Sequence, residues 1–299
     1  MAEKCIKCSK KQVCSGFCRS HFIEYFEKKV RKTIRKYELI KAKDKILVAA
    51  SGGKDSSVLL IVLAKLGYKI EAANINPDIG KYTKDNISNL KKVCEKYDIP
   101  LRIISFQKEL GMPLKKIKEK AKKNKKDMAY CMICGIFKRY LLNKFARENK
   151  YDVICTGHNM DDEAQAFVMN VFRNDIKLAK RQGPVSGTGK NKKFVKRIKP
   201  LYMMSEKEII TYSKLMKIPA FYGICPYSEN AYRRVFLNFL NEFEKSNPNV
   251  KNNIVQFFLN NIKPKNITKQ VEINSCKYCG EPTANNVCKA CEILRLVEE

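Results

Sequence analysis

The sequence has no tryptophan, only two histidines in 299 residues, and half as many acidic as basic side chains. It also has no run of eighteen or more apolar residues, which excludes a conventional transmembrane helix. The N-terminus carries Cys5 and Cys8 where a secretory signal peptide would need an apolar segment. We therefore expect a cytoplasmic protein that does not associate with a membrane.

The shortage of acidic residues leaves a large positive charge. Sixty Lys and Arg against thirty Asp and Glu give a formal net charge of +30, so we expect a polyanionic partner, with nucleic acid as the first candidate. Residues 22–41 are helical in pattern and very basic. This segment is either an arm that contacts phosphate or a solvated helix face, and the sequence leaves both open.

The sequence is rich in cysteine, with thirteen in all. In a reducing compartment, paired cysteines indicate metal or redox chemistry more than a disulfide framework. Two sets have the spacing of a closed tetrahedral zinc site, one near each end of the chain. The first set is Cys5, Cys8, Cys18 and His21, with Cys14 as an alternative to Cys18 or His21. The second set is Cys276, Cys279, Cys288 and Cys291.

A glycine-rich turn lies between an expected strand and an expected helix. The apolar residues 46–50 lead into Ser51-Gly52-Gly53, and the apolar residues up to Leu66 follow, with Asp55 or Ser56 expected to cap the helix. Adjacent glycines and a helix start together favour phosphate binding. A Walker A loop is excluded, because Lys54 is followed by Asp55 and not by Ser or Thr.

Strands and helices alternate after this turn. Residues 69–76, 101–106 and 152–156 are expected strands, and residues 82–97 form an expected helix between the first two. This order predicts an α/β fold, a parallel sheet with helices on both faces. Ligands of such sheets bind beyond the carboxyl ends of the strands, where the glycine-rich turn and residues 157–165 both lie. Asp161, Asp162 and Glu163 could hold Mg²⁺ or act as a base, or Asp161 or Asp162 could simply cap the next helix.

Three further cysteines lie in the central part of the chain. Cys131 and Cys134 are expected at a helix start, where the helix dipole favours thiolates. Cys225 lies in a Gly-Ile-Cys-Pro-Tyr segment, and no fourth cysteine has a comparable setting.

The Ser-Gly-Gly-Lys-Asp-Ser motif at residues 51–56 resembles the loop of PP-loop ATPases. With the three cysteine sets in this order, nearly the whole chain resembles the TtuA and NcsA type of tRNA 2-thiolation enzyme, relatives of TtcA. The resemblance implies ATP and Mg²⁺, a [4Fe-4S] cluster on Cys131, Cys134 and Cys225, two Zn²⁺ and a homodimer. Three protein ligands leave one iron of such a cluster without a protein ligand. A persulfide mechanism using Cys134 or Cys225 is the alternative. It assigns the nucleotide to Ala50, Ser51, Gly52, Gly53, Lys54, Asp55, Ser56, Ser57, Gly157 and His158. The expected domains are an N-terminal zinc finger (1–27), a PP-loop ATPase domain (28–265) and a C-terminal zinc finger (266–299).

The resemblance also implies a reaction. The C2 oxygen of a tRNA uridine would attack the α-phosphate of ATP, and sulfur would then replace the adenylated oxygen. We expect Lys54 and Asp55 to act at the phosphates, with Lys138 as an electrophilic helper and Asp161 as an acid or base. The expected target is the wobble uridine, with the T-loop as the alternative, and the sulfur comes from sulfide or from a thiocarboxylated ubiquitin-like protein. The rival hypothesis is a non-catalytic zinc-containing RNA-binding protein.

Overall fold

A central sheet organises the chain. The computed structural model describes residues 3–187, 193–228, 232–262 and 273–298. Within these residues the sheet has six strands in the order β3-β2-β1-β4-β6-β5; the β5 strand runs antiparallel to β6, and the other pairs are parallel. The strands are Ile46–Ala49 (β1), Ile70–Asn76 (β2), Leu101–Ser105 (β3), Val153–Thr156 (β4), Val185–Ser186 (β5) and Lys196–Ile198 (β6).

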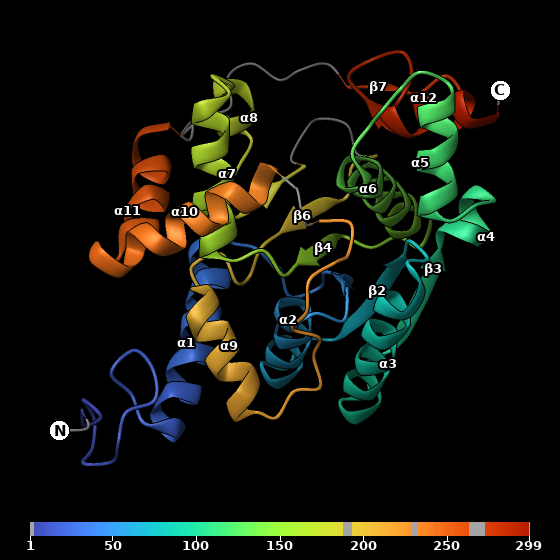
Figure 1. Cartoon of the computed structure of the whole chain (residues 1–299). Coiled ribbons are helices and arrows are strands. Elements are labelled where there is room, and N and C mark those ends of the chain that lie inside the picture. The colour runs from blue at the N-terminus through green and yellow to red at the C-terminus, as the bar shows by residue number, and fades with distance from the viewer. Residues whose placement is uncertain (1–2, 188–192, 229–231, 263–272, 299) are drawn as a thin grey trace.

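Both faces of the sheet are covered (Figure 1). Alternate residues of β1 belong to different cores, since Leu47 packs on one side and Val48 on the other, as the two-residue period of a strand requires. The Val48 side is covered by α1 (Arg19–Lys36), α2 (Lys54–Lys65), α3 (Gly80–Lys96) and α9 (Glu206–Leu215). The Leu47 side is covered by α4 (Phe106–Leu110), α5 (Leu114–Lys123), α6 (Tyr130–Glu148) and α12 (Lys289–Glu298).

A smaller helical layer packs beside the sheet. It consists of α7 (Met160–Phe172), α8 (Ile176–Lys180), α10 (Tyr232–Ser246), α11 (Val250–Phe257) and the short π-helix η1 (Phe258–Ile262). The α7 helix packs against both α10 and α11. Lys251 of α11 is buried between Asp161 and Glu244, with Nζ–O distances of 2.6 and 2.8 Å. This ion-pair network fixes α11 onto the start of α7.

The cysteine-rich ends are joined to the body of the protein. Near the N-terminus, Phe17 and Cys18 belong to the same core as Phe22 of α1, and the expected domain boundary at 27/28 falls inside α1. At the other end, β7 (Asn274–Ser275) and β8 (Pro282–Thr283) precede α12, and buried Glu281 pairs with Arg147 of α6 at 2.5 Å. The expected boundary at 265/266 lies outside the described residues.

The predicted fold class is confirmed, and two local predictions are wrong. The N-cap of α2 is Gly53, with no side-chain hydrogen bond, so neither Asp55 nor Ser56 caps it. Phe106 begins α4 and does not end β3. Every helix in the described part of the chain is too short or too polar to span a lipid bilayer.

Candidate active site and metal sites

The glycine-rich turn joins β1 to α2 at the carboxyl end of the sheet. Gly52 has a φ of +85°, and a Cβ there would lie 2.2 Å from the main-chain oxygen of Asn86, so the turn accepts only glycine at this position. Ser56 Oγ accepts a hydrogen bond from Ser51 N and donates one to Gly53 O, which closes the turn. The amides at the start of α2 therefore remain available to an anion, supported by the positive end of the helix dipole.

Lys54 lies at the first position of α2 and is held by two carboxylates. Its Nζ is 3.0 Å from Asp55 and 2.8 Å from Glu206, the first residue of α9. Burial alone would lower the pKa of Lys54, but the negative charges of Asp55 and Glu206 outweigh it and raise that pKa. The side chain is thus a fixed cation beside the turn.

The segment that follows β4 closes the other side of the turn. A Cβ on Gly157 would be 3.0 Å from the carbonyl carbon of Asp55 and from Ser56 N, so a larger residue would push the two segments apart. Asn159 Nδ2 donates to Asp55 Oδ1 at 3.0 Å. Asn159 is also the N-cap of α7, where it forms a capping box with Asp162. The structure therefore brings the two expected nucleotide segments together, and one of the expected acidic residues is a capping residue.

The segment that carries Cys225 crosses the glycine-rich turn. Phe221 N donates to Gly52 O at 3.2 Å, and Phe221 and Gly53 form a parallel β-bridge. The Phe221 ring also makes an edge contact with Tyr82 of α3, with centroids 5.4 Å apart. Cys225 follows four residues later, so main-chain contacts hold its segment at the phosphate-binding turn.

The three central cysteines lie at this same edge of the sheet. Cys131 and Cys134 are on the first turns of α6, and Cys131 Sγ is 3.5 Å from the main-chain oxygen of Tyr227. The rings of Tyr227 and Tyr130 stack with centroids 4.1 Å apart, which joins the start of α6 to the Cys225 segment. The cysteine trio and the glycine-rich turn are therefore neighbours.

The electrostatics of the trio reflect this proximity. Burial raises the pKa of Cys134; the Lys138 ammonium lowers it, and negative charge on Cys225 and Cys131 raises it further. Burial and Cys225 likewise raise the pKa of Cys131, again opposed by Lys138. Lys138 is thus a cation close to both thiols, and the Arg139 guanidinium also lies within electrostatic reach of Cys134.

The trio is too widely spaced for a single ion. The groups of Cys, His or acidic ligand atoms that lie within 4.8 Å of one another, among the described residues, are the two terminal sets and not this one. A four-iron cube is larger than one ion and separates its ligands further. The three thiols and the neighbouring positive charges of Lys138 and Arg139 fit such a cluster.

Both carboxylate oxygens of Asp161 have partners. It is buried, one of its oxygens pairs with Lys251 at 2.6 Å, and the other accepts a hydrogen bond from Glu206 N at 2.8 Å. The neighbouring carboxylates are paired as well, Asp162 with Arg233 and Glu163 with Lys199. This geometry gives Asp161 a positioning role for Glu206, which in turn holds Lys54.

Two metal sites lie near the ends of the chain. Zinc–sulfur bonds of about 2.3 Å in a tetrahedron put two sulfurs about 3.8 Å apart, and a sulfur and an imidazole nitrogen about 3.6 Å apart. In the first set Cys8 and Cys18 are 3.7 Å apart, and His21 Nδ1 is 3.4 Å from Cys5 and 3.5 Å from Cys18. In the second set Cys279 and Cys288 are 3.7 Å apart. The ligand atoms of each set are therefore already at zinc-like spacing, and Cys14 is not among them.

Sequence reasoning missed the residues that assemble the site. Phe221, Tyr82 and Glu206 lie in segments without a motif, and they meet the turn only through tertiary contacts. Asn159, by contrast, belongs to the expected segment 157–165, and its position before an acidic helix start is typical of the N-cap that it forms. His158 itself is exposed, and its Nδ1 is 3.0 Å from Thr156 Oγ1.

Comparisons with known proteins agree with this arrangement. Residues 23–238 match the family model of the PP-loop domain. The chain is 37% identical to a tRNA-5-methyluridine(54) 2-sulfurtransferase of Pyrococcus horikoshii, with 94% of this chain and 88% of the relative covered. It is 31% identical to the tRNA 2-thiolation protein NcsA of Haloferax volcanii, with 99% of each covered.

A solved structure is also similar over nearly the full length. It is the U34-tRNA thiolase NcsA of Methanococcus maripaludis with its [4Fe-4S] cluster, at 32% identity and a TM-score of 0.82, covering 99% of this chain and 96% of that one. With a matching family model and relatives above 30% identity along the whole chain, the protein belongs to the TtuA/NcsA family of tRNA 2-thiolation enzymes within the PP-loop ATPases.

Proposed function

We propose that this protein replaces the C2 oxygen of a tRNA uridine with sulfur, at the expense of ATP. The observation that carries the proposal is the hydrogen bond from Phe221 N to Gly52 O, 3.2 Å long. It joins the segment of Cys225 to the phosphate-binding turn, so that an activated oxygen and a sulfur source would meet at close range. A non-catalytic RNA-binding protein would have no need of this juxtaposition.

The first step we propose is adenylation. The uridine C2 oxygen attacks the α-phosphorus of ATP, an oxygen–phosphorus bond forms, and pyrophosphate leaves. The amides at the start of α2 would bind the phosphates, and Lys54, fixed by Asp55 and Glu206, would stabilise the charge that develops on them. Mg²⁺ would enter with the nucleotide, with the Asp55 carboxylate as its protein ligand. Asp161 receives no acid–base role in this scheme.

In the second step, sulfide sulfur attacks C2, the bond from C2 to the adenylated oxygen breaks, and AMP leaves. A [4Fe-4S] cluster held by Cys131, Cys134 and Cys225 would keep one iron free of protein ligands and so supply a binding position for hydrosulfide. Lys138, the cation beside these thiols, would favour the arrival of negatively charged sulfur and polarise the uridine. A persulfide on Cys134 or Cys225 is the competing route.

Zinc is the ion we propose for both terminal sites, on the ligand set and on the spacing of their sulfurs. The sulfur donor, sulfide or a thiocarboxylated ubiquitin-like protein, stays a prediction, as do the homodimer and the wobble position. Relatives act at either position, since one similar protein is named for uridine 54 and another for uridine 34. A relative in Drosophila melanogaster is named a cytoplasmic tRNA 2-thiolation protein, which supports the expected compartment.

The proposal is tested with enzyme purified anaerobically. We expect pyrophosphate release that requires tRNA, and about four irons and four sulfides per chain. The Cys131→Ala variant should lose the iron and the sulfide. Mass spectrometry of the tRNA nucleosides identifies the product: a 2-thiouridine derivative in the anticodon or 5-methyl-2-thiouridine in the T-loop. Thiolation that survives in iron-free enzyme would remove the cluster route, and absence of both ATP cleavage and thiolated product would refute the proposed function.

A further inference from the structure

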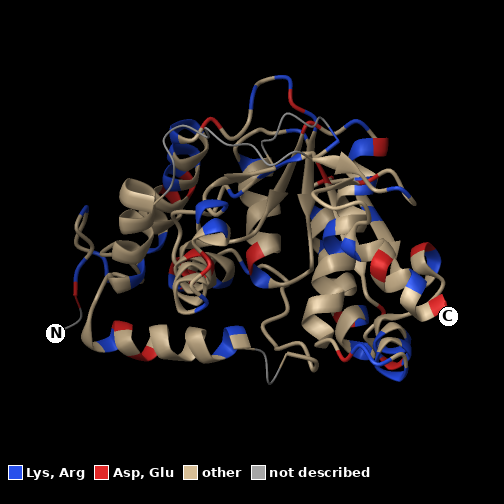
Figure 2. Ribbon diagram, turned by 90° about the horizontal axis from the view of Figure 1, so that it is seen from above, with Lys and Arg blue, Asp and Glu red and all other residues tan. Residues whose placement is uncertain are grey.

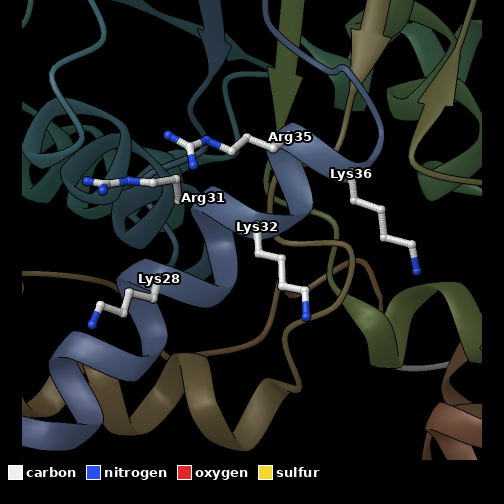
Figure 3. A pocket seen from close by; sticks show the side chains of 5 residues that line it. All are labelled: Lys28, Arg31, Lys32, Arg35 and Lys36. Atoms are coloured by element: carbon white, nitrogen blue, oxygen red, sulfur yellow. The ribbon is translucent and has the colours of Figure 1, made fainter.

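The exposed face of the C-terminal half of α1 is entirely cationic. We call it the basic face; it consists of Lys28, Arg31, Lys32, Arg35 and Lys36. These five side chains line a hollow of about 570 Å³ (Figure 3). Lys and Arg occur on most elements of the protein (Figure 2), but here five of them follow one another along two turns of a single helix.

The opposite face of α1 fixes the position of these charges. Phe22, Phe26, Val30 and Ile34 are buried in the core beside the sheet. Burial of four large apolar side chains holds the helix firmly, so the basic face is presented on a rigid element. Flexible lysines on a loose arm would lack this geometry.

The protein does not neutralise the basic face. Among the described residues Arg31, Lys32 and Arg35 have no carboxylate within 4.0 Å, and Lys28 has only the exposed Glu24. Lys29, which points inward from the same helix, does have a buried partner, Glu208 at 3.0 Å. Clustered cations repel one another, and an external polyanion removes that repulsion.

The helix is also connected to the active site. Glu206 and Glu208 both belong to the first turn of α9; Glu206 pairs with Lys54 of the phosphate-binding turn, and Glu208 pairs with Lys29 of α1. In Figure 3, Arg31 and Arg35 extend to one side of the helix and Lys32 and Lys36 to the other. The side chains could therefore reach several phosphates of one strand.

Resting on the proposed function, we propose that the basic face of α1 binds the phosphodiester backbone of the substrate tRNA. It contacts phosphates and not bases, because long flexible cations without a pocket for a base position the RNA but do not recognise its sequence. The face thereby contributes affinity and orientation, and it does not take part in the chemical step.

The test compares two triple variants that carry the same charge. Arg31→Gln, Lys32→Gln and Arg35→Gln are combined on α1, and Lys91→Gln, Lys92→Gln and Lys96→Gln on α3, where the three lysines are likewise exposed within six residues of one helix. Each phosphate contact contributes about 0.7 to 0.9 to the slope of log affinity against log salt. From 50 to 200 mM salt, the fall in tRNA affinity should therefore be about 20- to 40-fold smaller in the α1 variant than in wild type.

We expect the α3 variant to keep the wild-type salt dependence, and both variants to unfold at the wild-type temperature because the replaced side chains are exposed. At saturating tRNA the α1 variant should retain kcat and show a raised KM. The proposal would be overturned if the α1 variant kept the wild-type slope of log tRNA affinity against log salt, or if the α3 variant changed that slope equally. It would also be overturned if the α1 variant lost binding to phosphatidylserine vesicles but kept its tRNA binding. Lys54→Ala separates this outcome from the proposed function, because it should stop ATP cleavage and leave the tRNA salt slope intact.

Discussion

Gly52 offers the sharpest test of the phosphate-binding turn, because the chain contains a matched control. Gly52 and Gly67 both have a φ of +85°, but a Cβ on Gly67 would meet nothing within 4 Å. An alanine in this left-handed region costs about 1 to 2 kcal/mol. Gly67→Ala should therefore lower the free energy of unfolding by that amount and leave ATP cleavage unchanged.

Gly52→Ala carries the same conformational cost and a collision in addition. Its Cβ would lie 2.2 Å from the main-chain oxygen of Asn86, and ordinary contact begins at 3.4 Å. The turn must then move by about 1.2 Å relative to α3, and a displacement of about 1 Å typically costs about 100-fold in rate. We expect at least that loss in tRNA-dependent pyrophosphate release.

The assay pairs pyrophosphate release with urea unfolding for both variants. The difference between them isolates the collision, since the backbone conformation is the same. If Gly52→Ala cleaved ATP as fast as Gly67→Ala, the turn would not be the nucleotide site that its geometry indicates. Similar stability of the two variants would show that the turn can shift without strain.

Three further predictions concern the supports of the site. Lys251→Met should destabilise the protein by about 3 to 5 kcal/mol in urea unfolding, because it removes the ammonium that pairs with the buried Asp161 carboxylate. Adding Asp161→Asn to that variant should restore both stability and ATP cleavage. A double variant that is stable but inactive would instead indicate that Asp161 acts as an acid or base. Tyr227→Ala should lower the iron content, because it removes the ring that stacks on Tyr130, and Tyr227→Phe should retain iron. Equal iron content in the two variants would show that ring stacking does not support the cysteine site. Cys288→Ala should reduce bound zinc from two ions per chain to one by metal analysis, and a count of two would place the second ion elsewhere.

The sheet and the metal sites were predictable from local sequence. The apolar residues of β1, β2 and β4 are short runs bounded by turns, a pattern that a buried parallel strand produces without help from distant residues. The two terminal sets of metal ligands were predictable for the same reason, because Cys-x-x-Cys spacing sets the geometry within a few residues. The helical period of α1 continues past residue 27, and that is why a boundary drawn there cuts a helix.

The contacts that assemble the active site were not predictable in this way. Lys251 lies 90 residues from Asp161 in the sequence, and no motif near either residue predicts their ion pair. Asp161 therefore resembled a free acid in a catalytic crevice until its partner was known. The same holds for Glu206, whose capping position on α9 is evident from Ser205 and Glu208 but whose ion pair with Lys54 depends on the packing of two helices.

The join between the phosphate-binding turn and the cysteine segment consists of main-chain atoms. Phe221 N donates to Gly52 O, so this hydrogen bond depends little on which amino acid occupies position 221. It depends strongly on the backbone conformation of Gly52. The left-handed backbone conformation of Gly52 goes with a carbonyl that faces the Phe221 segment. Because Gly52 has no side chain, the main chain of Asn86 can pack closely against it. A change in the turn on binding ATP phosphates would therefore be transmitted directly to the segment of Cys225. In the proposed scheme, the step that activates the oxygen and the step that delivers sulfur therefore share one piece of backbone.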